Sequence, residues 1–295
     1  MGILLSKETR VVVQGITGNE GTFWTERMLA AGTNIVGGVT PGKGGAVVHG
    51  VPVYNTVREV VDKHGAEASV IFVPPPFAKD ATFEALEAGL KLVVLLVDGL
   101  PVQDAMEVRT YAKETGAYVI GPNNPGMATI GEAMLGFIPV WLSYVYQPGN
   151  IGVVARSGSL INEVCSHIVA AGLGISTCIG LGGDPVPGTT LTEVLDLFQK
   201  DEHTKGIVII GEVGGSMEED AAEFMKAGGF TKPAVAFIAG RSAPPGKKMG
   251  HAGAIMTLGR GSVQSKESAL SAAGVKIAQR PSEVGRLLLE ALAEN

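Results

Sequence analysis

Short runs of Val and Ile alternate along the chain with longer stretches in which apolar residues recur at the spacing of an amphipathic helix. Parallel strands that are buried on both faces give such continuous apolar runs, and helical crossovers join them. In the first half this pattern predicts strands at residues 10–13, 34–39, 68–73, 92–97 and 117–120, with helices at 22–31, 56–64, 79–88 and 102–115. The first half is therefore predicted to be a doubly wound α/β domain.

The alternation is lost between residues 121 and 148 and then begins again. The second half predicts strands at 151–155, 176–180, 206–211, 234–239 and 275–278, and helices at 159–171, 190–200, 217–227, 263–273 and 281–294. A chain of 295 residues is long enough for two domains of ordinary size. We predict a first domain at residues 1–148 and a second at 149–295.

Composition excludes several classes of function. A net charge of -6 gives no general attraction for nucleic acid or for an anionic membrane surface. No apolar run reaches the roughly 18 residues that span a bilayer, and the first residues resemble neither a signal nor a transit peptide, so we expect a cytoplasmic protein. Cys165 and Cys178 lack metal-ligand or redox spacing and are predicted to be structural thiols. Neither H-E-x-x-H nor G-x-S-x-G occurs, so no metal site is predicted.

A glycine-rich turn, Q-G-I-T-G-N-E-G at residues 14–21, follows the first predicted strand and leads into a helix. Backbone N–H groups in such a turn can bind phosphates. A nicotinamide dinucleotide would require an acid about 20 residues later, but none occurs between Glu26 and Glu59, where Lys43 lies among glycines instead. A cation there favours a ligand with an extra phosphate, such as CoA or NADP. The alternatives are an ordinary tight turn and a solvated lysine.

The second half contains a second set of candidate residues. Ser157, Gly158 and Ser159 follow a predicted strand and begin a helix, whose free N–H groups would attract a phosphoryl group. His251, among small residues, is the candidate nucleophile, and Glu212, at the end of another strand, is a candidate to orient its ring. The alternatives are a normally capped helix, a loop histidine and a solvated acid.

Five motifs in order along the chain resemble the α subunit of succinyl-CoA synthetase, an NDP-forming acid–CoA ligase. They are Q-G-I-T-G at 14–18, G-G-V-T-P-G-K-G-G at 37–45, G-G-D-P at 182–185, I-G-E-V-G-G at 210–215 and M-G-H-A-G-A at 249–254. The resemblance covers essentially the whole chain. It implies a Rossmann-like CoA-binding domain followed by a flavodoxin-like ligase domain.

The resemblance also implies a role for each candidate residue. A partner β subunit with an ATP-grasp site would use ATP or GTP with Mg to make an acyl phosphate from a small carboxylic acid, in an αβ or α2β2 complex. His251 would carry the phosphoryl group, Glu212 would orient it, and residues 157–159 would stabilise it. CoA would then attack the acyl phosphate. The implied CoA contacts are Thr17, Gly18, Asn19, Glu20, Lys43, Leu96, Val97 and Asp98.

Three positions depart from the family pattern near the expected acid. Asn162 replaces a tyrosine in R-S-G-T-L-T-Y-E, Asn124 replaces the cysteine in G-P-N-C-P-G, and Arg241 adds a cation. These changes suggest an acid more polar or more anionic than succinate, such as citrate, malate or sulfoacetate, against the alternative of an unchanged succinate site. The sequence leaves two alternative functions open: an NADP-dependent oxidoreductase, and a CoA-binding regulatory module without catalysis.

Overall fold

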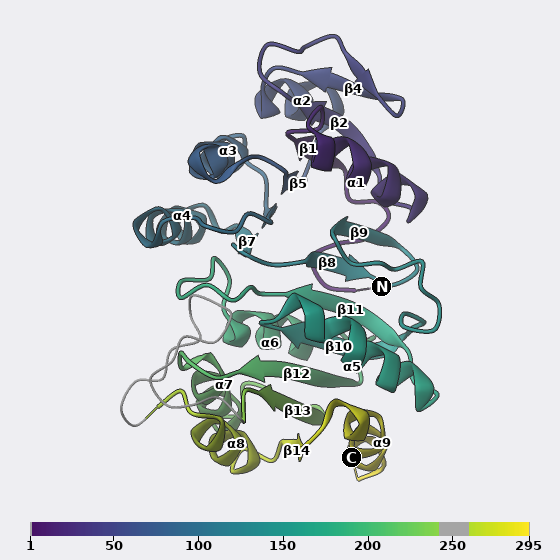
Figure 1. The fold of residues 1–295 in the computed structure, drawn as a ribbon, viewed down its shortest axis with the longest axis vertical. Helices are drawn as coiled ribbons and strands as arrows, with labels where there is room; N and C mark the ends of the chain where they lie inside the picture. Colours follow the sequence, from purple (N-terminus) through teal and green to yellow (C-terminus); the bar gives the residue numbers. More distant parts are fainter. Residues whose placement is uncertain (1, 242–259, 295) are drawn as a thin grey trace. The chain divides into compact units, whose positions relative to one another are not determined.

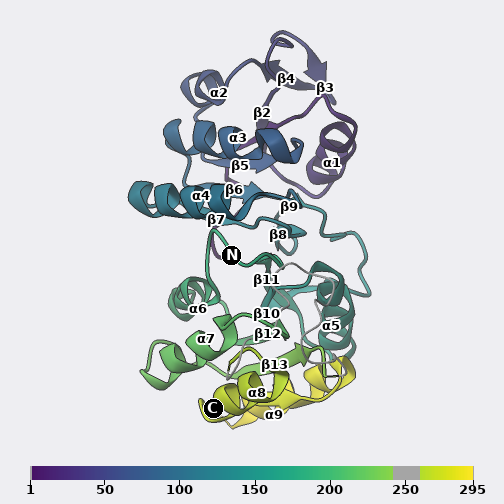
Figure 2. The same cartoon turned by 60° about the vertical axis from the view of Figure 1, so that its left-hand side comes forward.

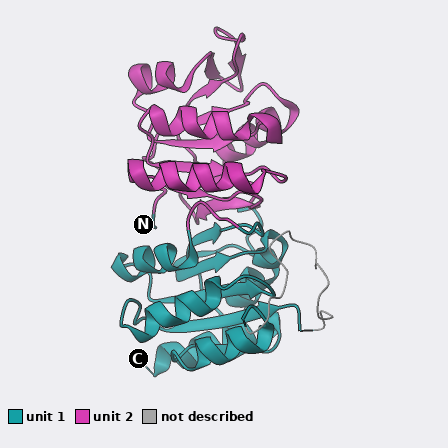
Figure 3. Ribbon diagram, turned by 90° about the vertical axis from the view of Figure 1, so that its left-hand side faces the viewer, with its two compact units in different colours: residues 1–3, 140–185, 190–295 teal, residues 4–139, 186–189 magenta. Residues whose placement is uncertain are grey.

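The computed structural model describes residues 2–241 and 260–294. The chain divides into two compact units, shown in separate colours in Figure 3. The N-terminal unit comprises residues 4–139 with 186–189, and the C-terminal unit comprises residues 1–3, 140–185 and 190–295. Within the described ranges, no helix combines the length and the apolar character that crossing a bilayer requires.

The N-terminal unit is built on a sheet with the strand order β3-β4-β2-β1-β5-β6-β7. Without the small edge strand β3, this is the order of a Rossmann fold, and the strands from β4 to β7 are parallel. Helix α1 covers one face, while α2, α3 and α4 lie together on the other (Figure 1 and Figure 2). The elements are β1 (Val11–Gln14), α1 (Asn19–Ala30), β2 (Ile35–Val39), β3 (Val47–Val48), β4 (Val51–Tyr54), α2 (Val57–His64), β5 (Ala68–Ile71), α3 (Pro75–Glu87), β6 (Leu92–Leu95), α4 (Val102–Thr115) and β7 (Tyr118–Ile120).

Apolar side chains from the central strands and from these helices form the core of the N-terminal unit. Val12, Ile71, Val93 and Leu95 are all at most 1% exposed, as expected of parallel strands covered on both faces. An antiparallel pair, β8 (Gly126–Thr129) and β9 (Ala133–Gly136), completes the unit.

The C-terminal unit contains parallel strands in the order β14-β13-β12-β10-β11. In chain order this is 5-4-3-1-2, the arrangement of flavodoxin, so both predicted fold types are confirmed. Helices α5 and α9 pack together, and α6, α7 and α8 form a second group. The elements are β10 (Pro148–Ala155), α5 (Gly158–Ala170), β11 (Ile175–Gly180), α6 (Leu191–Lys200), β12 (Gly206–Glu212), α7 (Met217–Lys226), β13 (Ala234–Ala239), α8 (Val263–Ser271), β14 (Lys276–Ala278), the 3-10 turn η1 (Pro281–Glu283) and α9 (Val284–Ala293).

The predicted helices and parallel strands are present, with ends displaced by a few residues. The sequence pattern did not predict β4, which is parallel to β2, or the short antiparallel strands β3, β8 and β9. The turn between β3 and β4 is formed by His49 and Gly50, both at positive φ, and β8 and β9 lie in the stretch that appeared irregular. These strands are only two to four residues long and contain too few alternating positions for the pattern to be recognised.

Candidate functional site

A cavity of about 630 Å³ opens in the N-terminal unit where β1, β2 and β5 end. In doubly wound sheets this edge, where the strand order reverses, is the usual place for a ligand. Its walls come from three segments that are distant in sequence: Gln14, Gly15, Thr17 and Gly18; Val39, Thr40, Pro41 and Lys43; and Phe72, Val73, Pro74, Phe77, Asp80, Ala81 and Glu84.

Glycines of the 14–21 turn are required by close backbone contacts. A Cβ on Gly15, which has φ +80°, would lie 2.4 Å from the carbonyl oxygen of Phe72, and one on Gly21 would lie 2.2 Å from that of Gly15. Gly18 is the N-cap of α1, and no side chain caps this helix end. Uncapped N–H groups at a helix N-terminus are donors for an anion such as phosphate.

Lys43 lies on a loop beside this turn and is exposed. Asn55 Oδ1 accepts hydrogen bonds from Gly42 N (2.9 Å) and Gly44 N (3.1 Å), the residues on either side of Lys43. In the part of the chain that the structure describes, no carboxylate forms an ion pair with Lys43. The glycine turn, the helix end and this cation fit a phosphate-rich ligand such as CoA.

The predicted CoA contacts separate into two groups. Thr17, Gly18 and Lys43 line the cavity, and the Thr17 hydroxyl donates to Oγ1 of Thr40, another lining residue (3.1 Å). Asn19 and Glu20 lie in the exposed first turn of α1.

The other predicted contacts, Leu96, Val97 and Asp98, follow β6 and are not among the residues that line the cavity. Leu96 is buried, Asp98 is exposed, and the Val97 carbonyl accepts from Asn123 N (2.7 Å). Sequence reasoning missed Phe77, an aromatic ring at the cavity that is 61% exposed. Its only sequence signal is the run of prolines before it, which begins α3.

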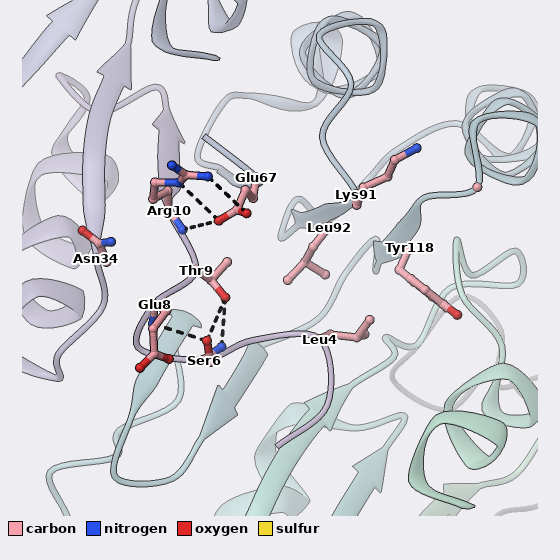
Figure 4. Close-up of a pocket in the computed structure, with 11 residues that line it drawn as sticks. Leu4, Ser6, Glu8, Thr9, Arg10, Asn34, Glu67, Lys91, Leu92 and Tyr118 are labelled. Carbon is pink, nitrogen blue, oxygen red and sulfur yellow. Dashed lines mark hydrogen bonds and ion pairs between the residues drawn. The ribbon is translucent and has the colours of Figure 1, made fainter. Parts of the chain in front are cut away.

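A second cavity of about 610 Å³ lies at the opposite, amino-terminal ends of strands in the same unit (Figure 4). Its charged groups already have partners. Arg10 forms an ion pair with Glu67 (3.3 Å), and Lys91 Nζ donates to the carbonyl oxygen of Thr115 (2.7 Å). Because both cations are already paired, this cavity is less suited to binding an anion than the first one.

In the C-terminal unit, the turn from β10 to α5 contains residues 157–159. Ser157 is the N-cap of α5 but makes no side-chain capping bond; its hydroxyl lies 3.2 Å from that of Ser159. The backbone N–H groups of the first turn therefore have no side-chain cap. His167 lies in the last turn of this helix.

Arg156, the residue before Ser157, links this helix end to Glu212. Its guanidinium is buried, with Nη2 3.3 Å from Glu212 Oε1 and Nη1 donating to the Gly214 carbonyl (2.6 Å). Glu212 is the last residue of β12 and is only 7% exposed. The structure thus brings together the predicted helix end and the predicted carboxylate, through an arginine for which the sequence suggested no role.

Lys266 of α8 lies beneath the same loop and is completely buried. Its ammonium group donates to the carbonyl oxygens of Glu212 (2.8 Å) and Gly214 (2.6 Å) and to the buried carboxylate of Glu218. Glu218 also accepts from Glu212 N (3.2 Å) and lies 3.7 Å from Arg156. Burial lowers the pKa of Lys266 from its usual value, and the nearby Glu218 opposes that shift. We call Arg156, Glu212, Glu218 and Lys266 the buried ionic cluster.

Asn162, one of the predicted substrate-adjacent residues, lies in α5 beyond its first turn. The hydroxyl of Tyr146 donates to Asn162 Oδ1 (2.5 Å). Tyr146 is 3% exposed, and burial, with Cys178 and Cys165 nearby, raises the pKa of its phenol. Tyr146 therefore remains a neutral donor that fixes the orientation of the Asn162 amide, a pairing that the sequence analysis did not identify.

The side chains of the other two predicted substrate-adjacent residues form hydrogen bonds or ion pairs within their own units. Asn124 Nδ2 donates to the carbonyl oxygen of Leu95 (2.6 Å), and its Oδ1 accepts from Gly126 N (2.6 Å). Arg241 forms an ion pair with Glu267 of α8. His251, the candidate nucleophile, lies outside the described residues, so its predicted role remains a prediction.

Comparisons with known proteins agree with these two units. A family model described as a CoA binding domain matches residues 6–99, and one described as CoA-ligase matches residues 154–276. The chain is 54% identical over 288 residues to the ADP-forming sulfoacetate-CoA ligase subunit SauD of Bilophila wadsworthia, with 98% of each chain covered. It is 51% identical over 292 residues to the ADP-forming succinate–CoA ligase subunit alpha 2 of Archaeoglobus fulgidus, covering 99% of this chain and 100% of that one.

Among solved structures, the fold is similar to that of ATP citrate lyase from Methanothrix soehngenii in complex with citrate and coenzyme A. The TM-score is 0.90 and the identity 25%; the match covers 99% of this chain but 51% of that one, so this chain spans about half its length. The match of residues 154–276 to a ligase does not favour the oxidoreductase or the regulatory module. The chain belongs to the family of ADP-forming acid–CoA ligase subunits of the succinyl-CoA synthetase α type.

Proposed function

We propose that this chain is the α subunit of a ligase that couples ATP or GTP hydrolysis to the formation of an acyl-CoA from a short, strongly anionic acid. The observation that carries this proposal is the 3.3 Å contact between Arg156 and Glu212, because it joins an uncapped helix N-terminus and a buried carboxylate into one site. Such a site can stabilise a phosphoryl group and orient an imidazole that carries it.

The phosphoryl group would be carried by His251. In the proposed sequence, a ring nitrogen of His251 attacks the γ-phosphorus of the nucleotide on a partner ATP-grasp β subunit, and the nucleoside diphosphate leaves. The acid's carboxylate then attacks the phosphorus of the phosphohistidine, giving an acyl phosphate and free imidazole. Glu212 would accept the N–H of the other ring nitrogen and so fix the tautomer, while the N–H groups of residues 157–159 would stabilise the phosphoryl oxygens. The assignment of His251 rests on its M-G-H-A-G-A motif.

CoA, when bound, supplies the thiol that attacks the acyl carbon of the acyl phosphate and displaces inorganic phosphate. The residues that would hold it are those of the first cavity. The N–H groups of the 15–21 turn would bind its diphosphate, and Lys43 would bind its additional ribose phosphate. Phe77 provides an exposed aromatic face at the same cavity.

For the acid, we favour a sulfonated substrate such as sulfoacetate over succinate. A relative that is 54% identical is named as a sulfoacetate-CoA ligase subunit, and Asn162 offers amide donors where the family motif has a tyrosine. The Tyr146 hydroxyl already bonds to the carbonyl oxygen of Asn162, so the amide nitrogen is the group that would donate to the acid. A sulfonate presents three oxygen acceptors for such a donor. Asn124 and Arg241 are less suited, since both already bond within the protein.

The phosphoryl transfer can be tested with the purified chain, its β subunit and γ-labelled nucleotide. We expect an acid-labile label on this chain, no label on His251→Asn and slower labelling of Glu212→Gln. His203→Asn, a change at an exposed histidine, is the matched control and should be labelled normally. An acid-stable label, or full labelling of His251→Asn, would contradict the proposal.

The acid can be identified from kcat/KM for sulfoacetate, succinate, citrate and malate. We expect Asn162→Tyr to lower the ratio of kcat/KM for sulfoacetate over succinate by about tenfold or more, the cost of one hydrogen bond to a charged group. Tyr146→Phe should lower the same ratio by less, because the amide keeps its position but loses its fixed orientation. A wild-type preference for succinate would exclude the sulfonated acid.

A further inference from the structure

Asn55, directly after β4, holds the loop that carries Lys43. Its Oδ1 accepts from the backbone N–H groups of both Gly42 and Gly44, at 2.9 and 3.1 Å. A single side-chain oxygen thus binds the N–H groups of the residues before and after Lys43. The contact is close enough that a Cβ on Gly44 would lie 2.5 Å from Asn55 Nδ2.

Backbone bonds also hold this loop. Lys43 N donates to the Thr40 carbonyl (3.0 Å), the Lys43 carbonyl accepts from Ala46 N (3.2 Å), and Gly45 N donates to the Val53 carbonyl (2.9 Å). Gly42 and Gly45 both adopt positive φ, at +77° and +92°. Glycine loses more conformational freedom than any other residue when it is fixed. Without the Asn55 oxygen, the N–H groups of Gly42 and Gly44 would lose their partner, so the segment around Lys43 would sample more conformations and the lysine would reach its ligand in fewer of them.

We propose that Asn55 is a positioning residue for the additional phosphate of CoA, acting through Lys43 without touching the ligand. The inference rests on the proposed function, in which Lys43 binds that phosphate. The ligand chemistry is a ribose 3′-phosphate, which distinguishes CoA from an otherwise identical dephospho-CoA. Fixing the loop in advance removes an ordering cost from binding, so the benefit appears only for ligands that use Lys43.

The test compares CoA with dephospho-CoA as substrates of the α–β complex, using wild type, Lys43→Ala and Asn55→Ala. We expect wild type to have the lower KM for CoA, and both variants to lose about tenfold of this preference. For Asn55→Ala, KM for dephospho-CoA and kcat at saturating CoA should stay within about twofold of wild type. Asn34→Ala, another exposed asparagine of the same unit, is the control and should behave as wild type.

The outcomes separate the two ideas. If Lys43→Ala loses the preference and Asn55→Ala keeps it, the positioning role of Asn55 is wrong while the proposed function stands. If Lys43→Ala keeps the preference, Lys43 does not bind the additional phosphate and both ideas fail at this residue. If Asn55→Ala raises KM for both substrates equally, its effect is general destabilisation, and the inference is overturned.

Discussion

Each unit of this chain has a turn from its first parallel strand to a helix with no side-chain cap, but the residues around the two turns differ in charge and burial. In the N-terminal unit, the turn from β1 to α1 consists of glycines and neutral side chains, and its cation, Lys43, is exposed to solvent. In the C-terminal unit, the turn from β10 to α5 begins with the buried Arg156, and the 7% exposed Glu212 and the fully buried Lys266 lie beside it.

The difference follows from what each turn has to hold. In the proposed function the first turn binds an anion that arrives from solvent, so backbone N–H groups and a loop lysine suffice. The second holds the Glu212 carboxylate of the protein itself in the buried interior, beside other charged groups. The buried charges keep Glu212 in place because leaving any of them unpaired would cost free energy. The position of the Glu212 loop is therefore coupled to the stability of the unit. Substitutions should therefore affect stability most in the second turn and ligand binding most in the first.

The largest effect is expected from Lys266→Met. This change leaves Glu218 buried with one cationic partner fewer and deprives two carbonyl oxygens of their donor. Breaking a buried ion pair by removing one partner costs about 3–5 kcal/mol. We expect that loss in the free energy of unfolding, measured by chemical denaturation of the full chain.

Lys200→Met is the matched control, since Lys200 pairs with Asp196 on the surface of α6 and its side chain is 70% exposed. It should cost less than about 0.5 kcal/mol. If the two variants are equally stable, the buried ionic cluster does not support its unit, and the contrast between the two turns is lost.

A smaller effect is expected from Gly15→Ala in the first turn. The new Cβ would meet the Phe72 carbonyl oxygen at 2.4 Å, in addition to the cost of φ +80°, and we expect a loss of about 3 kcal/mol together with a raised KM for CoA. Gly50→Ala has nearly the same φ, +82°, but open space around the Cβ. It should cost only about 1 kcal/mol and leave KM unchanged. Equal values of KM in the two variants would show that the close contact at Gly15 does not shape the site.

The smallest effect concerns pH, and it belongs to the C-terminal unit because the N-terminal unit contains no cysteine. Burial raises the pKa of the Cys165 thiol well above its usual value. Above about pH 8.5 the unfolded chain releases that proton while the folded chain retains it, so stability falls as pH rises, by up to about 1.4 kcal/mol per pH unit.

Cys165→Ala should therefore show a shallower loss of stability from about pH 8.5 to 10. The measurement is the slope of the unfolding free energy against pH, since the alanine also removes packing at every pH. The lowered pKa of Lys266 acts with the opposite sign, because there the folded chain releases a proton that the unfolded chain still binds. The Lys266 contribution is the same in wild type and in Cys165→Ala, so it cancels when the two slopes are compared. Parallel slopes would exclude the thiol as the cause.

Much of the fold could be predicted because long apolar runs and amphipathic periods are local properties of the chain. Helix α4 and strand β13 have the predicted ends, and both strand orders agree with the predicted fold types. The sequence also selected residues that the fold brings together, although their roles stay predictions: Thr17, Gly18 and Lys43 line one cavity, and Arg156 connects Glu212 to the turn at residues 157–159. Those residues carry motif or spacing signals, which single-residue partners such as Asn55, Tyr146 and Lys266 do not.

The sequence by itself determined the α/β class, the family and the kinds of residue available for phosphate and CoA chemistry, since these depend on periodicity and on short motifs. Only the tertiary structure decided which side chains support them. In the sequence, Lys266 and Lys200 are both lysines within predicted helices, and no local signal distinguishes them. In the structure, Lys266 is fully buried under the Glu212 loop, whereas Lys200 is exposed. The reason is physical: burial and pairing depend on residues brought together from distant strands, and no local pattern records which partners meet.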